Sequence, residues 1–298
     1  MKIKGKTTIA IILISALIMM GLIGCSRQGD DIIKIGGKNF SEQFIMAEML
    51  SLLIEENTNL QTEIQTNLAG NVIIDAIKSD QIDLYLEYTG TGLINLGIEP
   101  MNNPEEVYEI VKREFEKEFR IKWLEPYGFN NTYTMAVTRD TAEKYNLRTF
   151  SDMAAIGEEL VLGCTHVFTE RDDGYPGLSK YYNFEFSDVK GMDPALMYQA
   201  LVEENVDVIS AFATEGRIAA FDLVMLEDDK QFFPPYDAVP VVRMEILEKY
   251  PEIEEILNKL ANKIDDSIMA KLNAEVDLEK RDPEVVAHEF LKETGLLK

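Results

Sequence analysis

Apolar residues recur along the chain with two different spacings, and stretches of the two kinds follow one another. Every second position is apolar over 82–86, which predicts a strand; after Ser41 the spacing is helical, and we expect Ser41 to be the N-cap. The same patterns predict strands at Ile32–Ile35, Thr62–Asn67, Asn131–Val137, Leu160–Gly163 and Ala238–Val242 and from Val206, and helices at Val72–Lys78, Pro104–Phe119, Pro194–Glu203 and within Glu245–Lys298. This alternation indicates an α/β fold rich in parallel strands.

Two stretches repeat one pattern of strand, aspartate, aromatic residue and Thr/Gly turn. Asp83 precedes Tyr88 by five positions, and Asp207 precedes Phe212 by the same distance. The Thr-Gly-Thr-Gly run at 89–92 predicts a sharp turn at a strand's carboxyl end, where ligands bind in open α/β sheets. We therefore expect two similar lobes that each offer an aromatic ring to a shared cleft. The alternative is a repeat without a role in binding, because aromatic residues are common where strands meet turns.

Two basic residues lie in turns where they can bind an anion. Lys38 follows two glycines between the first strand and the next helix, whose N-terminus favours negative charge. Arg171 lies in the turn-rich stretch 169–178, and its planar guanidinium can hold a carboxylate with two hydrogen bonds. The alternatives are a solvated Lys38 and an Arg171 that pairs with Asp172 or Asp173.

The N-terminal residues have the composition of an export signal. Three lysines precede the apolar run Thr8–Ile23, which is short for a membrane span. The run ends in Leu-Ile-Gly-Cys, which resembles the lipobox of bacterial lipoproteins. This resemblance implies that residues 1–24 are a signal peptide, that Cys25 is lipidated, and that 25–31 form a tether. A plain signal peptide with an incidental Cys25 is the alternative.

Charge and cysteine content narrow the class of protein. Without the three lysines of the signal, 26 basic and 53 acidic side chains remain, a net charge of −27. That excess argues against nucleic acid and against an anionic membrane surface as partners. Once Cys25 is lipidated, Cys164 is alone and no disulfide can form within the chain. About 270 residues are enough to bury a core without disulfides.

An enzyme is the rival class, and the sequence offers little for it. Cys164 and His166 lie close together, but no partner motif supports a nucleophile, and neither histidine of the chain belongs to a metal-ligand cluster. Glu87 and Glu215 occupy comparable places after two strands, so a hydrolase or lyase with paired carboxylates is conceivable; we expect them to brace loops instead. We expect no catalytic residue, metal or cofactor.

Four motifs resemble one known family. They are Gly-Lys-Asn-Phe-Ser-Glu-Gln at 37–43, Asp-Leu-Tyr-Leu-Glu-Tyr-Thr-Gly-Thr at 83–91, Asp-Gly-Tyr-Pro-Gly-Leu at 173–178 and Ala-Phe-Ala-Thr-Glu-Gly-Arg-Ile at 211–218. The chain thereby resembles the substrate-binding proteins of osmoprotectant ABC importers for glycine betaine, carnitine and choline. This resemblance implies a two-lobed, type II periplasmic-binding-protein-like fold with the ligand in the cleft between lobes. Lobe 1 would comprise 32–136 and 238–298, and lobe 2 would comprise 137–237.

The resemblance also implies which residues bind the ligand. Its aromatic cage for a quaternary ammonium falls on Tyr88, Tyr133, Phe212 and Tyr236, with a backbone carbonyl from Asn131, and its carboxylate-binding positions fall on Lys38, Thr91 and Arg171. Phe212 departs from the family, which usually has tyrosine there. Phenylalanine keeps the ring face for the cation but loses the hydroxyl.

The expected function is solute capture for an ABC permease by hinge closure. A glycine betaine-type zwitterion ranks first, because choline lacks a carboxylate and would leave Lys38 and Arg171 unpaired. Choline, carnitine, a bulkier betaine and a sensor without transport remain alternatives. The expected partners are the solute, the permease with its ATPase, and the membrane through the lipid anchor. We expect a monomer on the extracytoplasmic face of a Gram-positive cell membrane.

Overall fold

The computed structural model describes residues 32–68 and 70–297. The predicted signal peptide, Cys25 and the tether lie outside the described residues. Within the described part of the chain, no helix is long and apolar enough to span a bilayer.

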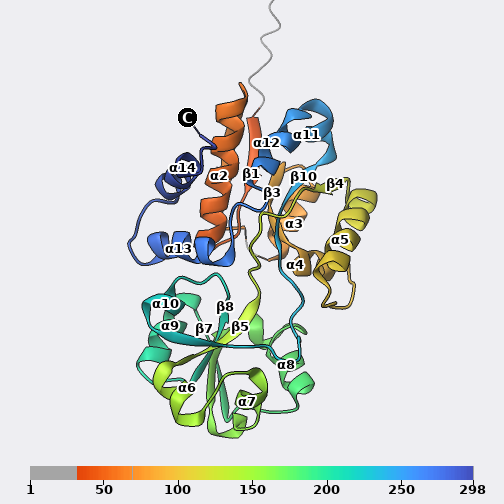
Figure 1. Ribbon diagram of the computed structural model, residues 1–298. Helices are drawn as coiled ribbons and strands as arrows, with labels where there is room; N and C mark the ends of the chain where they lie inside the picture. The colour runs from red at the N-terminus through yellow and green to blue at the C-terminus, as the bar shows by residue number, and fades with distance from the viewer. Residues whose placement is uncertain (1–31, 69, 298) are drawn as a thin grey trace, which may run out of the picture. The chain divides into compact units, whose positions relative to one another are not determined.

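Two five-stranded sheets form the framework (Figure 1). The first has the order β2-β1-β3-β10-β4, and its strands are β1 (Ile32–Gly36), β2 (Gln61–Gln65), β3 (Leu84–Tyr88), β4 (Ile121–Trp123) and β10 (Ala238–Arg243). The second has the order β7-β6-β8-β5-β9, and its strands are β5 (Tyr133–Thr138), β6 (Val161–Thr165), β7 (Asp188–Met192), β8 (Val208–Phe212) and β9 (Leu223–Leu226). The expectation of a mixed α/β fold is confirmed.

Both sheets contain the expected parallel strands, but one strand in each sheet runs the other way. β10 runs antiparallel to β3 and β4, and β5 runs antiparallel to β8 and β9. The chain enters each of these strands directly from the other sheet, so it makes no helical return over the same sheet, the connection that produces a parallel neighbour. The expected lobe boundary at 136/137 falls inside β5, all of which pairs within the second sheet.

Helices flank both sheets. Those of the part built on the first sheet are α2 (Ser41–Asn57), α3 (Asn71–Lys78), α4 (Thr89–Asn95), α5 (Pro104–Phe119), α11 (Met244–Lys249), α12 (Glu252–Leu257), α13 (Asp266–Asp277) and α14 (Pro283–Glu293). Those of the part built on the second sheet are α6 (Arg139–Tyr145), α7 (Phe150–Ala154), α8 (Tyr175–Tyr182), α9 (Pro194–Val202) and α10 (Arg217–Ala220). Helix α2 packs against α12, α13 and α14 (Figure 1).

Helix α5 shows how local sequence sets an element. Pro104 occupies its first turn, and the side chain of Asn103 accepts a hydrogen bond from Glu106 N at 3.1 Å. Its buried face reaches Trp123, whose ring lies 5.2 Å from that of Phe115 at 79°. The predicted helix 104–119 is confirmed, and Trp123 has no exposed surface.

The predicted capping role of Ser41 is wrong. Phe40 is the N-cap of α2, and no side chain caps the helix there. Ser41 is the first helical residue, and its hydroxyl donates to Asp277 Oδ1 at 2.5 Å. A hydrogen bond to another helix has replaced the local cap.

The Thr-Gly-Thr-Gly run is not an open turn but the start of helix α4. A Cβ atom on Gly90 would lie 2.8 Å from the ring of Tyr236, and one on Gly92 would lie 2.8 Å from that of Trp123. Glycine is therefore needed at 90 and 92 because an aromatic ring lies close to the backbone at each position, and not because the backbone conformation is unusual.

Candidate functional site

Three of the four predicted cage rings lie together. Tyr133 begins β5 and faces Phe212, the last residue of β8, across the antiparallel pair, with ring centroids 4.6 Å apart. The ring of Tyr236 meets that of Tyr133 edge-on at 6.0 Å and 81°. Tyr133 and Phe212 are half-buried, and Tyr236 is buried. Two strands of the second sheet and the segment that leaves it for β10 thus share one aromatic group.

Tyr88, the fourth predicted ring, lies in the first sheet and contacts other groups. Its ring stacks on Phe40 with centroids 6.5 Å apart, and the ammonium of Lys38 lies 4.6 Å from its centroid. Asn131 links it to the other rings: its backbone N–H donates to Tyr236 O at 3.0 Å, and its Nδ2 lies 3.5 Å from the Tyr88 hydroxyl.

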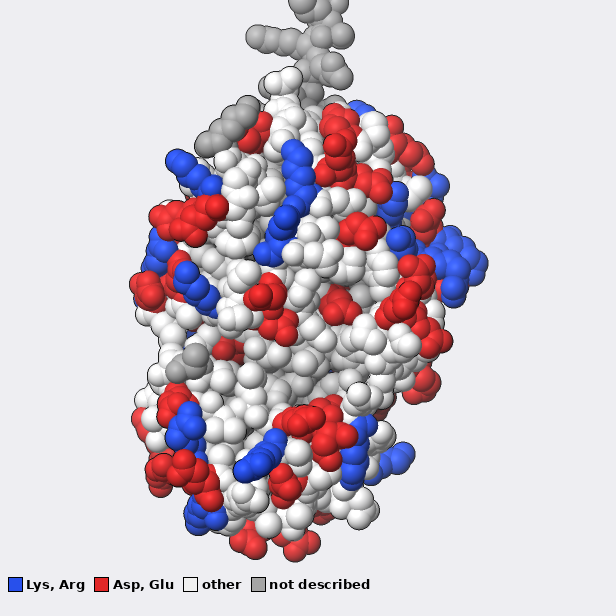
Figure 2. Space-filling view, in the orientation of Figure 1, with Lys and Arg blue, Asp and Glu red and all other residues white. Residues whose placement is uncertain are grey.

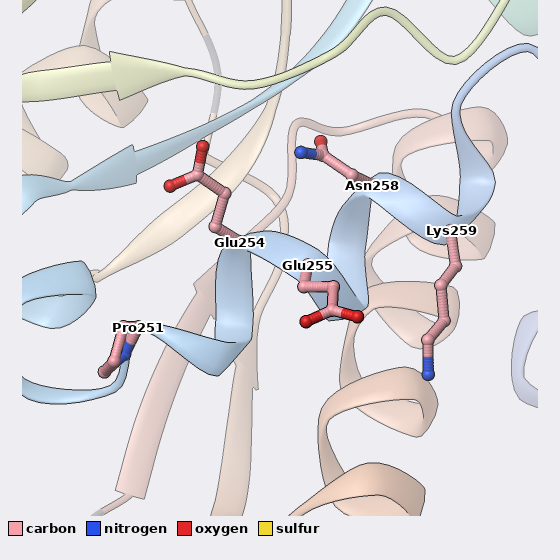
Figure 3. A pocket seen from close by; sticks show the side chains of 5 residues that line it. All are labelled: Pro251, Glu254, Glu255, Asn258 and Lys259. Carbon is pink, nitrogen blue, oxygen red and sulfur yellow. The ribbon is translucent and has the colours of Figure 1, made fainter.

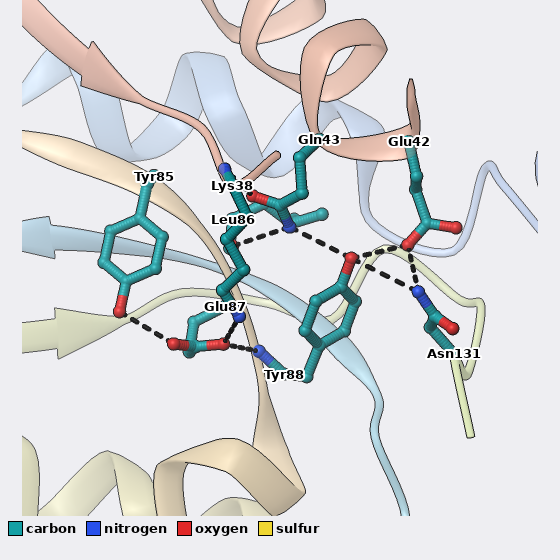
Figure 4. A network of polar contacts seen from close by, with 8 residues as sticks. All are labelled: Lys38, Glu42, Gln43, Tyr85, Leu86, Glu87, Tyr88 and Asn131. Carbon is teal, nitrogen blue, oxygen red and sulfur yellow. Dashed lines mark hydrogen bonds and ion pairs between the residues drawn. The ribbon is translucent and has the colours of Figure 1, made fainter. Parts of the chain in front are cut away.

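Polar groups fix the hydroxyl of Tyr88 (Figure 4). It donates to Glu42 Oε1 at 2.5 Å and accepts from Gln43 Nε2 at 3.0 Å. Burial, followed by the charge of Glu42, raises the pKa of Tyr88 well above its usual value. Burial also raises the pKa of Glu42, although four hydrogen bonds oppose that shift. The ring of Tyr88 is held from its far end.

Lys38 forms a buried ion pair with Glu87 (Figure 4). Glu87 also accepts hydrogen bonds from the hydroxyl of Tyr85 and the backbone N–H of Tyr88, each at 2.8 Å. The alternative of a solvated Lys38 is wrong, because the residue is 9% exposed. Glu87 braces the end of β3 and neutralises the lysine, which agrees with the structural role expected for it.

Arg171 pairs with an aspartate two positions along the chain. Its Nε donates to Asp173 Oδ1 at 2.6 Å, and its Nη2 bonds the other oxygen. The alternative that Arg171 pairs with a neighbouring aspartate is confirmed. Asp173 Oδ2 also accepts from the hydroxyl of Tyr236 at 2.7 Å. Burial alone would raise the pKa of Asp173, but Arg171 and Tyr236 outweigh it and lower that pKa.

The family model for the substrate-binding domain of ABC-type glycine betaine transport systems, OpuAC, matches residues 31–293. The chain belongs to this family. The expected membership is confirmed, and the OpuAC family consists of substrate-binding transport proteins, not enzymes. A member is the extracytoplasmic component of an ABC importer.

Individual proteins that are similar to this OpuAC-family chain also belong to transport systems. It is 41% identical over 286 residues to the carnitine transport binding protein OpuCC of Listeria monocytogenes, with 95% of this chain and 92% of that protein covered. It is 39% identical to the ergothioneine transport permease/ergothioneine binding protein EgtU of Helicobacter pylori, covering 88% of this chain and 47% of that protein. The crystal structure of a glycine betaine/carnitine/choline ABC transporter superimposes with a TM-score of 0.80 at 39% identity, covering 89% of this chain and all of that one. The type II periplasmic-binding-protein fold is confirmed.

Thr91, predicted to bind a ligand carboxylate, is half-buried in the first turn of α4. Asn131 is 7% exposed, and its side-chain oxygen is buried without a hydrogen-bond partner among the described residues. The roles of Thr91 and Asn131 in binding rest on the family resemblance alone, so both stay predictions.

Residues of the rival enzyme interpretation are engaged or buried. Cys164 lies in β6 with no exposed surface, and burial raises its pKa to about 11, which disfavours the thiolate. Glu215 accepts a hydrogen bond from Arg217 Nη1 at 2.9 Å. Among residues 32–68 and 70–297, no group of three or more His, Cys, Asp or Glu side chains is placed to hold a metal ion.

Two surface hollows lie elsewhere and contain none of the predicted binding residues. One is lined by Pro251, Glu254, Glu255, Asn258 and Lys259 (Figure 3), and the other by Gly177, Lys180, Tyr181 and Phe232. In the first, Glu254 pairs with Lys122 at 2.8 Å and Lys259 donates to Asn57 at 2.6 Å. On the face shown in Figure 2, basic side chains lie scattered among acidic ones and form no continuous basic patch.

The sequence analysis did not predict Glu42 and Gln43, two consecutive residues that hydrogen-bond to the hydroxyl of Tyr88. Both are almost fully buried in α2. A signal existed, because Glu42 precedes Ile45 by three positions and Met46 by four, which puts it on the buried face of the helix. An acidic residue on such a face requires several hydrogen-bond donors.

Proposed function

We propose that this chain captures a quaternary-ammonium solute between its two lobes and delivers it to an ABC permease. The carrying observation is the aromatic group in which Tyr133 contacts Phe212 at 4.6 Å and Tyr236 at 6.0 Å. A quaternary ammonium has no N–H group, so a protein cannot hydrogen-bond it and must surround it with ring faces. Each ring contributes about 0.5–2 kcal/mol to such a contact. In this proposal Tyr88 completes the cage.

Charges around the rings support a ligand with a positive end. Glu42, Glu87 and Asp173 are buried carboxylates, whereas Lys38 and Arg171 are the cations paired among them. Because both cations are already paired, a lone anion would find no unbalanced positive charge at either of them. The proposed ligand therefore carries a cationic group, with or without a carboxylate.

A glycine betaine-type zwitterion remains our first choice, supported by the carnitine and glycine betaine named for relatives. Choline would not leave Lys38 and Arg171 unpaired, because Glu87 and Asp173 already neutralise them. That observation makes choline the second candidate. A zwitterion's carboxylate would have to share Lys38, Arg171 or Thr91 with these internal acids.

We further propose that the lobes are centred on the two sheets and that the chain crosses between them at 124–132 and 227–237. The first sheet and residues 238–298 form lobe 1; β5 belongs to lobe 2. Solute bound between the lobes shifts the equilibrium toward the closed form, which the permease receives. Lipidation of Cys25, a monomeric state and a Gram-positive cell surface complete the proposal.

Calorimetric titration with glycine betaine, carnitine and choline tests the proposal. We expect at least one to bind, and absence of heat with all three would overturn it. Tyr133→Ala should weaken binding at least tenfold, because it removes the central ring of the group. Tyr181→Ala is the matched control, since that tyrosine is 51% exposed and lies in the second hollow. Equal affinity of both variants would contradict the cage.

A further inference from the structure

Glu42, in the first turn of α2, is a buried carboxylate that forms no ion pair with any described residue. It is 2% exposed. Its Oε1 accepts from the hydroxyl of Tyr88 at 2.5 Å and from Asn131 Nδ2 at 2.8 Å. Its Oε2 accepts from the hydroxyl of Thr214 at 2.6 Å and from Asn273 Nδ2 at 3.2 Å. Four donors together replace the water that an ionised carboxylate loses on burial.

One oxygen of Glu42, Oε2, also reaches the second-sheet part of the chain. Tyr88 ends β3 of the first sheet, whereas Thr214 follows β8 of the second. Thr214 is 1% exposed, and its carbonyl accepts a second bond from Asn273 Nδ2 in α13 at 2.8 Å. The segment after β8 is thus held to the first-sheet part by both its hydroxyl and its backbone.

Contacts beside Thr214 extend this attachment. A Cβ atom on Gly216 would lie 2.6 Å from the backbone nitrogen of Ala274, so the two backbones meet where only glycine fits. Arg217 Nη2 lies 3.5 Å from Asp277 Oδ1, the oxygen that also accepts from Ser41. The attachment at Thr214 is therefore followed along the chain by contacts between α10 and α13.

We propose that Glu42 is a positioning residue that couples ligand binding at Tyr88 to closure of the two lobes through Thr214. The coupling rests on the proposed function, in which Tyr88 is a wall of the cage. Separating the lobes breaks the bonds of Thr214 to Glu42 and Asn273. Because Glu42 also fixes the hydroxyl of Tyr88, the closed arrangement and the binding orientation of that ring stabilise each other.

Thr214→Val tests the proposal, because it removes the cross-lobe donor and changes no residue of the cage or of lobe 1. We expect affinity for the best of glycine betaine, carnitine and choline to fall about tenfold, the loss of one hydrogen bond to a charged acceptor. Thr134→Val is the matched control: the hydroxyl of this buried threonine donates to Leu226 O at 3.0 Å within the second sheet. It should bind like the parent, even if its melting temperature falls.

Glu42→Gln and the double variant Glu42→Gln/Thr214→Val complete a cycle. We expect the double variant to lose less affinity than the product of the two single losses, since both changes break one contact. Hydrogen exchange at 213–217 should slow on ligand binding in the parent and not in Thr214→Val at saturating ligand. Parental affinity in Thr214→Val and Glu42→Gln, or unchanged slowing at 213–217, overturns the coupling. A parent that binds none of the three solutes overturns the proposed function, and the coupling with it.

Discussion

At the scale of single residues, both cations suggested for a ligand carboxylate are held by acids of the protein itself. Glu87 has no exposed surface and Asp173 is 6% exposed, so each would be a buried, uncompensated charge without its partner. Lys38 and Arg171 therefore neutralise these two acids of the protein, whether or not a ligand is bound. Removing either cation alone therefore disturbs the protein as well as the ligand.

Arg171→Met should lower the free energy of unfolding by about 3–5 kcal/mol, because it leaves the carboxylate of Asp173 buried and unpaired. The double variant Arg171→Met/Asp173→Asn should recover most of that loss. Urea unfolding measures both. If the single and double variants are equally unstable, the ion pair is not the cause.

The double variant also separates the two candidate ligands. If Arg171 binds a ligand carboxylate, Arg171→Met/Asp173→Asn should weaken carnitine binding far more than choline binding, by about tenfold. Calorimetric titrations of the double variant and of the parent with carnitine and with choline measure these losses. Equal losses for carnitine and choline would contradict the assignment of Arg171 to the carboxylate end.

At the scale of elements, α2 carries two acidic residues, Glu42 and Glu48, that lie in different surroundings. Glu42 in its first turn is surrounded by hydrogen-bond donors, whereas Glu48 lies half-buried where α2 packs on α14. Burial, followed by the charges of Glu284 and Asp282, raises the pKa of Glu48 to about 7. The folded protein therefore holds this proton to higher pH than the unfolded chain does.

Glu48 should make the protein less stable as pH rises. Because its folded pKa is raised, its stabilising contribution is full below about 4.5 and is lost as pH rises through about 7. Glu48→Gln should remove this loss, so the variant should gain stability over the parent between pH 5 and 8, measured by urea unfolding. Glu56→Gln, an exposed change on the same helix, should keep the parental slope. An unchanged slope in Glu48→Gln would refute the prediction.

At the scale of the whole molecule, sequence patterns located the elements and the family but not their connections. Helix 104–119 was predictable because its cap, first-turn proline and apolar spacing are all local. The antiparallel direction of β5 and β10 was not, because it depends on which sheet the chain has just left. The bond between Glu42 and Thr214 joins positions 172 residues apart, and only tertiary packing brings them together. The motif 37–43 contains Glu42, but its residue spacing does not predict that Thr214 is the partner of Glu42.

The position of β10 between β3 and β4 has a consequence for how the protein is made. β4 lies at the edge of the first sheet, and β10 is its neighbour there, although the whole second sheet is encoded between them. The chain is synthesised from its N-terminus, so β3 and β4 are made before β10. The place between them in the sheet stays empty until residues 238–243 have been synthesised. Until then they expose unpaired backbone edges, which favour wrong pairing with other chains. Wrong pairing at these edges is therefore most favoured before β10 has been synthesised.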